Sequence, residues 1–178
     1  HPLKNLNVWG EAGVVLTRSA ELAHNVRLFR NYGLLLRDEA VLFGTNSRFD
    51  TLQAVIGNRL IKEVEFITSR RISHAERYDR AFSDLEGSIS VPIRRAGVKH
   101  VFHLYIIRVD RRDELLAHLH GHGVEAKVHY PIPLHLQNAS AHLGYKKGDF
   151  PVAERDVEQV ITLPAHQHLT DEEVGYSI

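Results

Sequence analysis

The sequence predicts an α/β protein with a buried core. Its final third alternates segments typical of strands with segments typical of helices. An earlier and longer segment carries apolar side chains at helical spacing. Of the 178 residues, 43% are hydrophobic and 25% are charged, as is usual in globular domains. These observations together favour a compact α/β lobe that follows a long helical segment.

The elements before the lobe are predicted by local signals. Residues 12–17 are mostly apolar and predict a short buried strand. Ser19 is a favourable N-cap for a helix that Gly33 would close. A second cap-like residue, Asp50, begins the long apolar stripe. The stripe predicts one long helix, or two helices that meet near residues 68–69.

The lobe itself is predicted element by element. Residues 101–109 are apolar on both faces, which is typical of an interior strand. Asp110 is then expected to cap a helix that ends at Gly121, and residues 124–130 predict a second strand that stops at Pro131. Further on we expect a short helix at residues 140–143 and a longer helix at 151–159. A strand at 161–163 and a helix that begins with a capping box at Thr170 are expected to follow.

Composition argues against several classes of protein. The chain has no Cys, which excludes disulfides and thiolate zinc sites. Lys+Arg and Asp+Glu both number 22, and this balance argues against a nucleic-acid partner. No apolar run is long enough for a membrane span or a signal peptide, so we expect a cytoplasmic protein without a membrane partner. The absence of Met and the early stop of the last helix suggest a piece of a longer protein.

One lysine stands apart from the others. The chain has six Lys beside sixteen Arg, and Lys is the cation that burial can turn into a nucleophile. Lys4 lies in the segment His-Pro-Leu-Lys-Asn-Leu, just before a turn, whereas the other lysines lie on a helix, at strand ends or in a Gly-flanked turn. From these residues alone, a solvated lysine remains the better interpretation of Lys4.

Several motifs in combination resemble one family. They are His-Pro-Leu-Lys-Asn-Leu at 1–6, Trp-Gly-Glu-Ala-Gly at 9–13, Arg-Asn-Tyr-Gly at 30–33, Gly-Thr-Asn-Ser-Arg-Phe-Asp at 44–50 and Val-His-Tyr-Pro-Ile-Pro-Leu-His at 128–135. In this order they resemble the DegT/DnrJ/EryC1/StrS sugar aminotransferases of fold type I. The resemblance covers essentially the whole chain and implies the C-terminal half of such an enzyme. Residues 1–75 would then be the end of the large cofactor domain with the interdomain helix, and 76–178 the small C-terminal α/β domain, truncated at its last helix.

The resemblance also implies a reaction. The expected cofactor is pyridoxal 5′-phosphate, the expected substrate is a nucleotide-linked 3-keto-6-deoxyhexose, and glutamate is the expected amino donor. The pathway would be amino-sugar biosynthesis for a polysaccharide such as lipopolysaccharide, and the expected assembly is a homodimer with sites shared between subunits. Because the family's upstream half carries most cofactor ligands, we expect this chain alone to be inactive and to expose an apolar face.

Single residues acquire roles from the same resemblance. Lys4 corresponds to the lysine that forms a Schiff base with the cofactor. Asn46 would donate to the cofactor phosphate, and Arg48 would lie near the anionic substrate or donor, both in the neighbouring subunit's site. The segment bordering the sugar pocket is matched by His129, Tyr130 and His135. Without the resemblance, Asn46 and Arg48 are better interpreted as loop residues, and the other three as a strand end and a proline-rich loop.

Two other functions remain open, and three positions depart from the family pattern. Relatives that carry His in place of the lysine are sugar dehydratases, and Lys4 argues for transamination instead. A non-enzymatic metal-binding module would use the clustered histidines. However, only His118 and His122 could converge on the predicted helix, and Gly121 should end it between them. We therefore expect no metal site.

The departures are at Glu11, Tyr32 and Thr45, where Asp, His and Tyr are frequent in the family.

Overall fold

The computed structural model describes residues 1–85 and 87–178. Contacts within the chain divide it into two compact units, His1–Glu65 (unit 1) and Phe66–Ile178 (unit 2). This division falls before residue 75, where the sequence placed the domain boundary. The assignment of the two parts to domains of a larger enzyme stays a prediction. No helix of the described residues is both long and apolar enough to cross a membrane.

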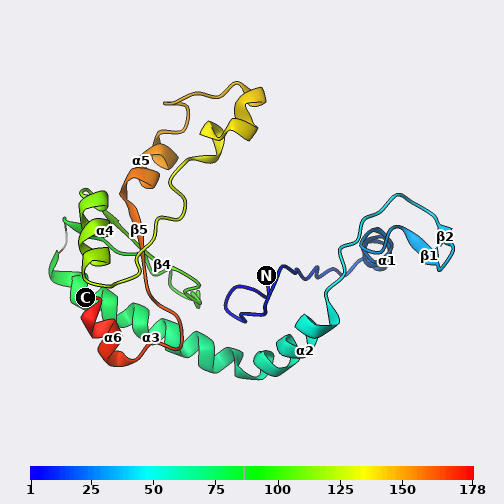
Figure 1. The fold of residues 1–178 in the computed structure, drawn as a ribbon, viewed down its shortest axis with the longest axis horizontal. Helices are drawn as coiled ribbons and strands as arrows, with labels where there is room; N and C mark the ends of the chain where they lie inside the picture. The colour runs from blue at the N-terminus through cyan, green and yellow to red at the C-terminus, as the bar shows by residue number, and fades with distance from the viewer. Residues whose placement is uncertain (86) are drawn as a thin grey trace. The chain divides into compact units, whose positions relative to one another are not determined.

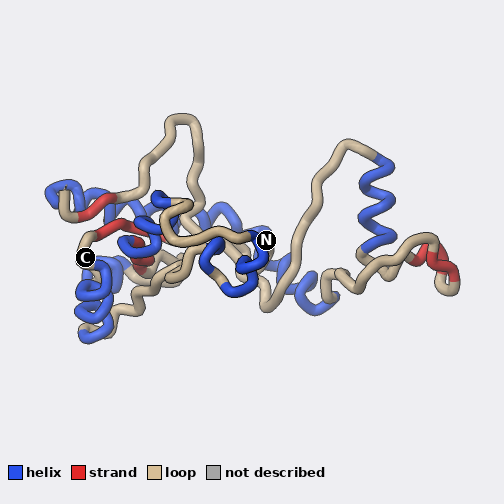
Figure 2. Tube along the Cα trace, turned by 90° about the horizontal axis from the view of Figure 1, so that it is seen from above, coloured by secondary structure: helices blue, strands red, loops and turns tan. Residues whose placement is uncertain are grey.

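Unit 1 consists of short elements joined by long loops (Figures 1 and 2). Its elements are α1 (Ala20–Phe29), β1 (Leu34–Leu36), β2 (Glu39–Ala40), α2 (Thr51–Leu60) and the 3-10 turn η1 (Ile61–Glu63). Ser19 caps α1 as predicted, since its Oγ accepts from the Leu22 amide at 3.1 Å. The helix ends earlier than predicted, at Phe29 with Arg30 as its C-cap; Gly33 lies in the following turn with φ +74°, where a Cβ would lie 1.8 Å from the Leu42 carbonyl oxygen. Only glycine therefore fits this turn.

The strand predicted at residues 12–17 is wrong. This segment has no regular secondary structure, and its apolar side chains at Val14, Val15 and Leu16 are 73%, 63% and 90% exposed. A strand requires backbone hydrogen bonds to a neighbouring strand. Within the described residues no segment pairs with it.

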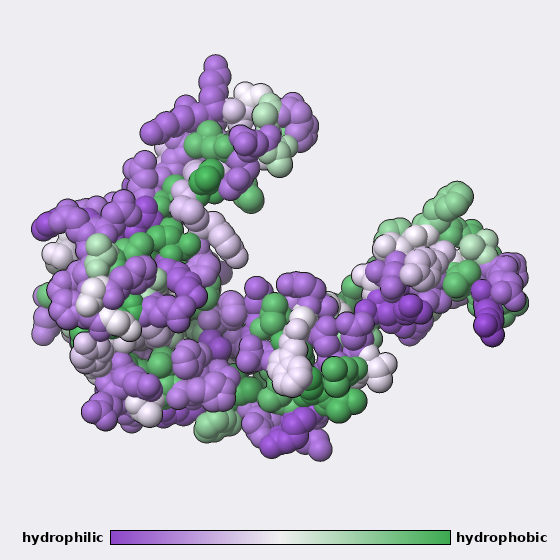
Figure 3. Space-filling view, viewed as in Figure 1, coloured by the Kyte–Doolittle hydropathy of each residue, from purple (hydrophilic) through white to green (hydrophobic). Residues whose placement is uncertain are grey.

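Unit 1 also exposes many large apolar side chains elsewhere. Figure 3 shows hydrophobic surface over α2, to which the exposed Leu52 and Val55 belong. Further exposed members of unit 1 are Trp9, Leu36, Phe43 and Ile61. Unit 1 thus has the exposed apolar surface that the sequence led us to expect, and self-association through it remains a prediction.

The long apolar stripe forms two helices. They are α2 and α3 (Val64–Phe82), and η1 joins them. The sequence allowed two helices that meet near residues 68–69, but the observed junction lies earlier in the chain. Asp50 occupies the N-cap position of α2. Its carboxylate accepts from the Gln53 side-chain amide at 3.1 Å instead of from a backbone N–H.

Unit 2 is an α/β lobe built on a three-stranded antiparallel sheet in the order β3-β4-β5 (Figure 1). Its elements after α3 are η2 (Ser83–Leu85), β3 (Ile89–Ser90), β4 (Tyr105–Val109), α4 (Arg112–Gly121), η3 (Leu134–Leu136), η4 (Asn138–Leu143), α5 (Pro151–Gln159), β5 (Val160–Leu163) and α6 (Asp171–Tyr176). The central strand is β4, with Ile107 opposite Ile161. This confirms the predicted interior strand, although residues 101–104 lie outside it.

Two expectations for unit 2 are wrong. Asp110 does not cap α4, because Arg111 holds the N-cap position. The Asp110 carboxylate instead accepts from the Gln159 side-chain amide at 2.8 Å. Residues 124–130 form no strand and make a single bridge, between Lys127 and Thr162. The Val124 and Ala126 amides donate to the Leu119 and Val124 carbonyls, both at 2.9 Å, so neither amide is available to a neighbouring strand.

The core of unit 2 lies between α3, the sheet and α6. Its buried side chains include Ala75, Tyr78, Phe82, Phe102, Tyr105, Ile107, Ile161, Leu163 and Val174. Tyr78 is fully buried; its ring centroid lies 4.9 Å from that of Tyr105 and 5.8 Å from that of Phe82, and its hydroxyl donates to the Pro164 carbonyl at 2.9 Å. This stack fixes α3 against β4.

α3 also buries two basic side chains, Arg71 and His74. His74 is fully buried, and neither ring nitrogen has a hydrogen-bond partner among the described residues. Burial, assisted by the nearby Arg70, lowers the pKa of His74 below its ordinary value near 6.5. Burial therefore disfavours the protonated form of this ring.

The capping box at the start of α6 is confirmed. The Thr170 hydroxyl accepts from the Glu173 amide at 3.1 Å, and the Glu173 carboxylate accepts from the Thr170 amide at 2.7 Å. Thr170→Ala should therefore lower the free energy of unfolding by about 1 kcal/mol in urea titrations followed by circular dichroism. Thr170→Ser, which keeps the hydroxyl, should stay near wild type. An equal loss in both variants would contradict a capping role.

Candidate functional site

Lys4 lies in a tight turn at the start of unit 1. Its amide donates to the His1 carbonyl at 3.0 Å, its carbonyl accepts from the Asn7 amide at 3.0 Å, and the buried Val8 follows. Asn7 adopts a positive φ of 60°, a conformation that Asn tolerates better than most residues. The Lys4 side chain is exposed, and its ammonium has no hydrogen bond or ion pair within the described residues. The turn thus exposes an amine that makes no hydrogen bond or ion pair with any other described residue.

Asn46 and Arg48 are brought together in the loop before α2. Arg48 Nε donates to Asn46 Oδ1 at 3.1 Å, and Arg48 Nη1 donates to Asn31 Oδ1 at 3.3 Å. The guanidinium lies 5.8 Å from the centroid of the Tyr32 ring. Because Asn46 uses its oxygen for Arg48, its amide nitrogen still has both hydrogens to donate. No described residue accepts from it.

The three residues of the expected sugar segment do not share one cavity. His129 Nδ1 lies 2.9 Å from Thr162 Oγ1, and the side chain lines a cavity of about 770 Å³. Tyr130 and His135 instead line a separate apolar cavity of about 710 Å³, together with Ile132 and Phe150. The structure therefore brings Tyr130 and His135 to one place and His129 to another.

His135 has a partner that the sequence did not reveal. Its Nε2 lies 2.9 Å from the Glu154 carboxylate, and both side chains are nearly buried, at 8% and 11% exposed. The same carboxylate accepts from the Gly148 amide at 2.8 Å and the Phe150 amide at 3.2 Å. These bonds, the one from Gly148 first, lower the pKa of Glu154. Glu154 thus fixes the position and orientation of the His135 ring.

The Glu154 interaction predicts a pH effect on stability. Because folding lowers the pKa of Glu154, its carboxylate stabilises the fold above its ordinary pKa of about 4.5. This contribution is lost as the pH falls through the lowered value. Glu154→Gln should therefore melt below wild type at neutral pH, and the gap should close under acid. Glu158→Gln, on the exposed face of the same helix, should show no gap. A gap for Glu154→Gln that is independent of pH would contradict this.

No group of three or more metal-ligating side chains occurs among residues 1–85 and 87–178. The His118 and His122 rings do approach each other, with centroids 4.3 Å apart. However, His122 Nδ1 lies 2.8 Å from the His118 carbonyl oxygen, and α4 ends at Gly121. The contact between the His118 and His122 rings is therefore part of the C-terminal end of α4.

The donors of unit 1 suit a cofactor that carries an aldehyde and a phosphate. Lys4 offers a primary amine for covalent attachment, and Asn46 offers two amide hydrogens to an anionic oxygen. Arg48 adds a permanent positive charge beside Asn46. By their chemistry the residues present therefore fit pyridoxal phosphate.

The fold of the chain occurs in solved enzyme structures. It superimposes on the structure of NtdA from Bacillus subtilis with the bound cofactor PMP, with a TM-score of 0.86 and 32% identity. The match covers 98% of this chain and 42% of that one. The chain also superimposes on the structure of a DegT DnrJ EryC1 StrS aminotransferase from Brucella abortus, with a TM-score of 0.88 and 31% identity, over 99% of this chain and 48% of that one. The chain therefore has the fold of part of an aminotransferase.

The chain belongs to the DegT/DnrJ/EryC1/StrS aminotransferase family, whose model matches residues 1–178. It is 38% identical to a pleiotropic regulatory protein of Geobacillus stearothermophilus, over 99% of this chain and 48% of that protein. It is 37% identical to the dTDP-3-amino-3,4,6-trideoxy-alpha-D-glucose transaminase of Streptomyces venezuelae, over 95% of this chain and 44% of the enzyme. The chain spans about half the length of the curated relatives it matches.

Proposed function

We propose that the whole protein is a pyridoxal-phosphate-dependent aminotransferase that converts a nucleotide-linked keto sugar to an amino sugar. This proposal is supported chiefly by the family match over the entire chain, together with an exposed Lys4 side chain whose amine has no partner among the described residues. The Streptomyces venezuelae relative, by its name a transaminase of a dTDP-linked amino sugar, supports this substrate class. We further propose a 3-keto-6-deoxyhexose as the sugar, glutamate as the donor and lipopolysaccharide biosynthesis as the pathway.

In this proposal the residues of the chain have distinct tasks. The cofactor, when bound, supplies the electron-withdrawing ring that weakens the bond to the departing proton. Lys4 Nζ would hold the cofactor and, once released as a free amine, would take the proton from the carbon that bears the amino group. Asn46 Nδ2 would donate to the phosphate, and Arg48, fixed by Asn46 and Asn31, would attract the anionic group of the substrate or donor.

Tyr130 and His135 would form an apolar wall for the sugar. The cavity that they line is bounded mainly by apolar side chains, and Glu154 holds His135 in place. His129, which lines a different cavity, would border the sugar only through its neighbour Tyr130. We therefore propose a substrate role for Tyr130 and His135 and an indirect one for His129.

The proposal is tested by locating the cofactor. The whole protein is loaded with pyridoxal phosphate, treated with borohydride, which makes the lysine link permanent, and digested for mass spectrometry. The added mass should fall on the peptide that contains Lys4. Modification of Lys62 or Lys147 in its place, or of no lysine, would sink the proposal.

We also propose a cytoplasmic homodimer in which Asn46 and Arg48 serve the neighbouring subunit's site. Lys4→Ala and Asn46→Ala should each lose most activity as pure proteins. If the two residues meet across subunits, mixing and re-equilibrating the variants should restore activity, because a mixed dimer has one site with both residues intact. Without recovery on mixing, the shared site is refuted.

A further inference from the structure

Unit 2 buries a cation that no carboxylate among its described residues neutralises. Arg71, on α3, is 6% exposed. Within the described residues it forms no ion pair, and burial lowers its pKa with no acidic group opposing the shift. A buried guanidinium without a counter-ion is costly, and buried charges in proteins are usually paired.

The hydrogen bonds of Arg71 leave one end of the guanidinium unused. Nη1 donates to the carbonyls of Phe102 at 3.1 Å and His103 at 2.9 Å, and Nε donates to Gln167 Oε1 at 3.1 Å. These three bonds use three of the five N–H groups. The remaining two lie on Nη2, and no described residue accepts from them. All three acceptors are neutral, so they fix the position of the charge without cancelling it.

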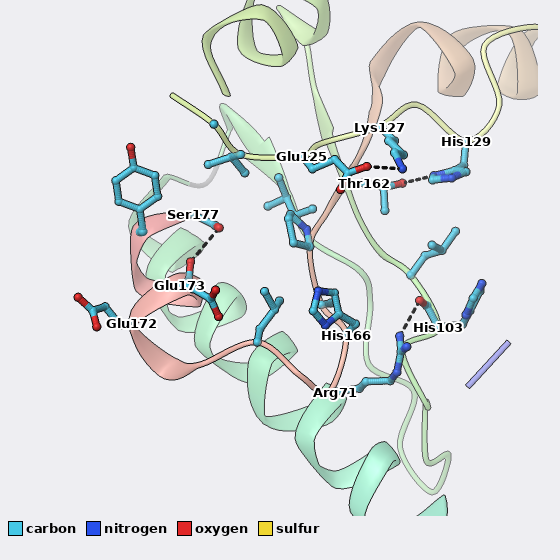
Figure 4. A pocket seen from close by; sticks show the side chains of 18 residues that line it. Arg71, His103, Glu125, Lys127, His129, Thr162, His166, Glu172, Glu173 and Ser177 are labelled. Carbon is cyan, nitrogen blue, oxygen red and sulfur yellow. Dashed lines mark hydrogen bonds and ion pairs between the residues drawn. The ribbon is translucent and has the colours of Figure 1, made fainter. Parts of the chain in front are cut away.

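Arg71 lines a cavity of about 770 Å³. Figure 4 shows it at one end of this cavity with His103 and His166 nearby, whereas Glu172 and Glu173 lie on the other side. Burial and the neighbouring His168 lower the pKa of His166, and the charge of Arg71 lowers it further, so Arg71 and His166 share one electrostatic environment.

The acidic residues around the cavity do not serve as counter-ions for Arg71. Glu125 pairs with Lys127 at 2.6 Å, and Glu173 accepts from the Thr170 amide at 2.7 Å in the capping box. Glu172 is exposed. The cavity thus has a fixed, desolvated cation at one end and acids engaged elsewhere.

We propose that this cavity binds a small oxyanion, a phosphate or carboxylate group, at Arg71 Nη2 beside His166. The site lies wholly within unit 2, and of the residues considered for transamination only His129 lines the same cavity. An anion there would accept the two unused N–H groups and supply the missing negative charge. Charge-assisted bonds of this kind are among the stronger ones in proteins.

The test is calorimetric titration of inorganic phosphate, and separately of acetate, into the cofactor-loaded whole protein, so that the cofactor's own phosphate site is filled. Arg71→Met should weaken binding of at least one anion about 10- to 100-fold. Arg80→Met, an exposed arginine on the same helix, should leave it unchanged. Arg48→Met should also leave anion binding unchanged, since a loss of binding in this variant would place the anion in unit 1 instead of at Arg71.

A second readout does not depend on the folding of a variant that lacks Arg71. In the wild-type protein, the bound anion should raise the pKa of His166, followed by NMR and assigned with His166→Gln. The other charged groups acting on His166 are His168, Glu125 and Glu173, which the anion leaves in place. The proposal is overturned if millimolar phosphate and acetate both fail to bind. It is equally overturned if Arg71→Met binds as wild type or if His166 does not respond.

Discussion

Replacing Lys4 by arginine in the whole protein is expected to lower turnover by at least about 10²- to 10⁴-fold, the usual contribution of proton transfer by a positioned group. Arginine keeps the charge and approximate length of the side chain but does not deprotonate near neutral pH. It therefore can neither hold the cofactor covalently nor accept the substrate proton. Single-turnover kinetics with the amino donor measure the loss directly.

The matched control for Lys4 is Lys62→Arg, in the exposed turn η1. It should leave turnover and cofactor absorbance unchanged. Chemical rescue gives a second check, since a small added amine should restore part of the activity of Lys4→Ala by accepting the proton in place of Nζ. If Lys4→Arg retains turnover near that of wild type, Lys4 is not the catalytic lysine.

Replacing Tyr78 by alanine is expected to cost about 3–5 kcal/mol in unit 2, the range for removing a large buried aromatic side chain. Tyr78 has no exposed surface, it packs on both Phe82 and Tyr105, and its hydroxyl is satisfied by Pro164. Because a typical domain is stable by only about 5–15 kcal/mol, this variant should be partly unfolded near 40 °C. Urea unfolding followed by circular dichroism measures the change.

The control for Tyr78 lies on the same helix. Phe66 is also aromatic but 58% exposed, so Phe66→Ala should change the free energy of unfolding by less than about 1 kcal/mol. Tyr78→Phe separates the ring from the hydroxyl and should cost about 1–2 kcal/mol, since it leaves the Pro164 carbonyl without its donor. Equal effects of Tyr78→Ala and Phe66→Ala would show that the ring stack does not stabilise unit 2.

Elements marked by adjacent residues were predictable from the sequence. The Ser19 cap, the helix that begins at Pro151 and the Thr170 capping box each depend on side chains within one turn of each other, and the structure confirms all three. The strands predicted at residues 12–17 and 124–130 were wrong for the opposite reason. Apolar, β-branched composition shows that a segment can form a strand, but a strand exists only where another segment pairs with it.

The site was predictable only in part, for a similar reason. Spacing alone left Lys4 an ordinary surface residue, and only its resemblance to a family motif singled it out. The Glu154–His135 pair joins residues 19 apart, and the three neutral acceptors of Arg71 come from two distant loops. Local sequence patterns carry no signal for such long-range contacts, since the contacts are set by how the chain packs.

His74 gives unit 2 a measurable thermodynamic property. Because folding lowers the pKa of the His74 ring, the unfolded chain binds more protons than the folded one at mildly acidic pH, so unfolding there takes up protons from the buffer. The pKa of His166 is also lowered in the folded protein, so this ring adds to the uptake. The calorimetric enthalpy of unfolding should therefore depend on the buffer's own heat of ionisation near pH 6, and this dependence should vanish at pH 8, where the imidazoles are neutral in both states.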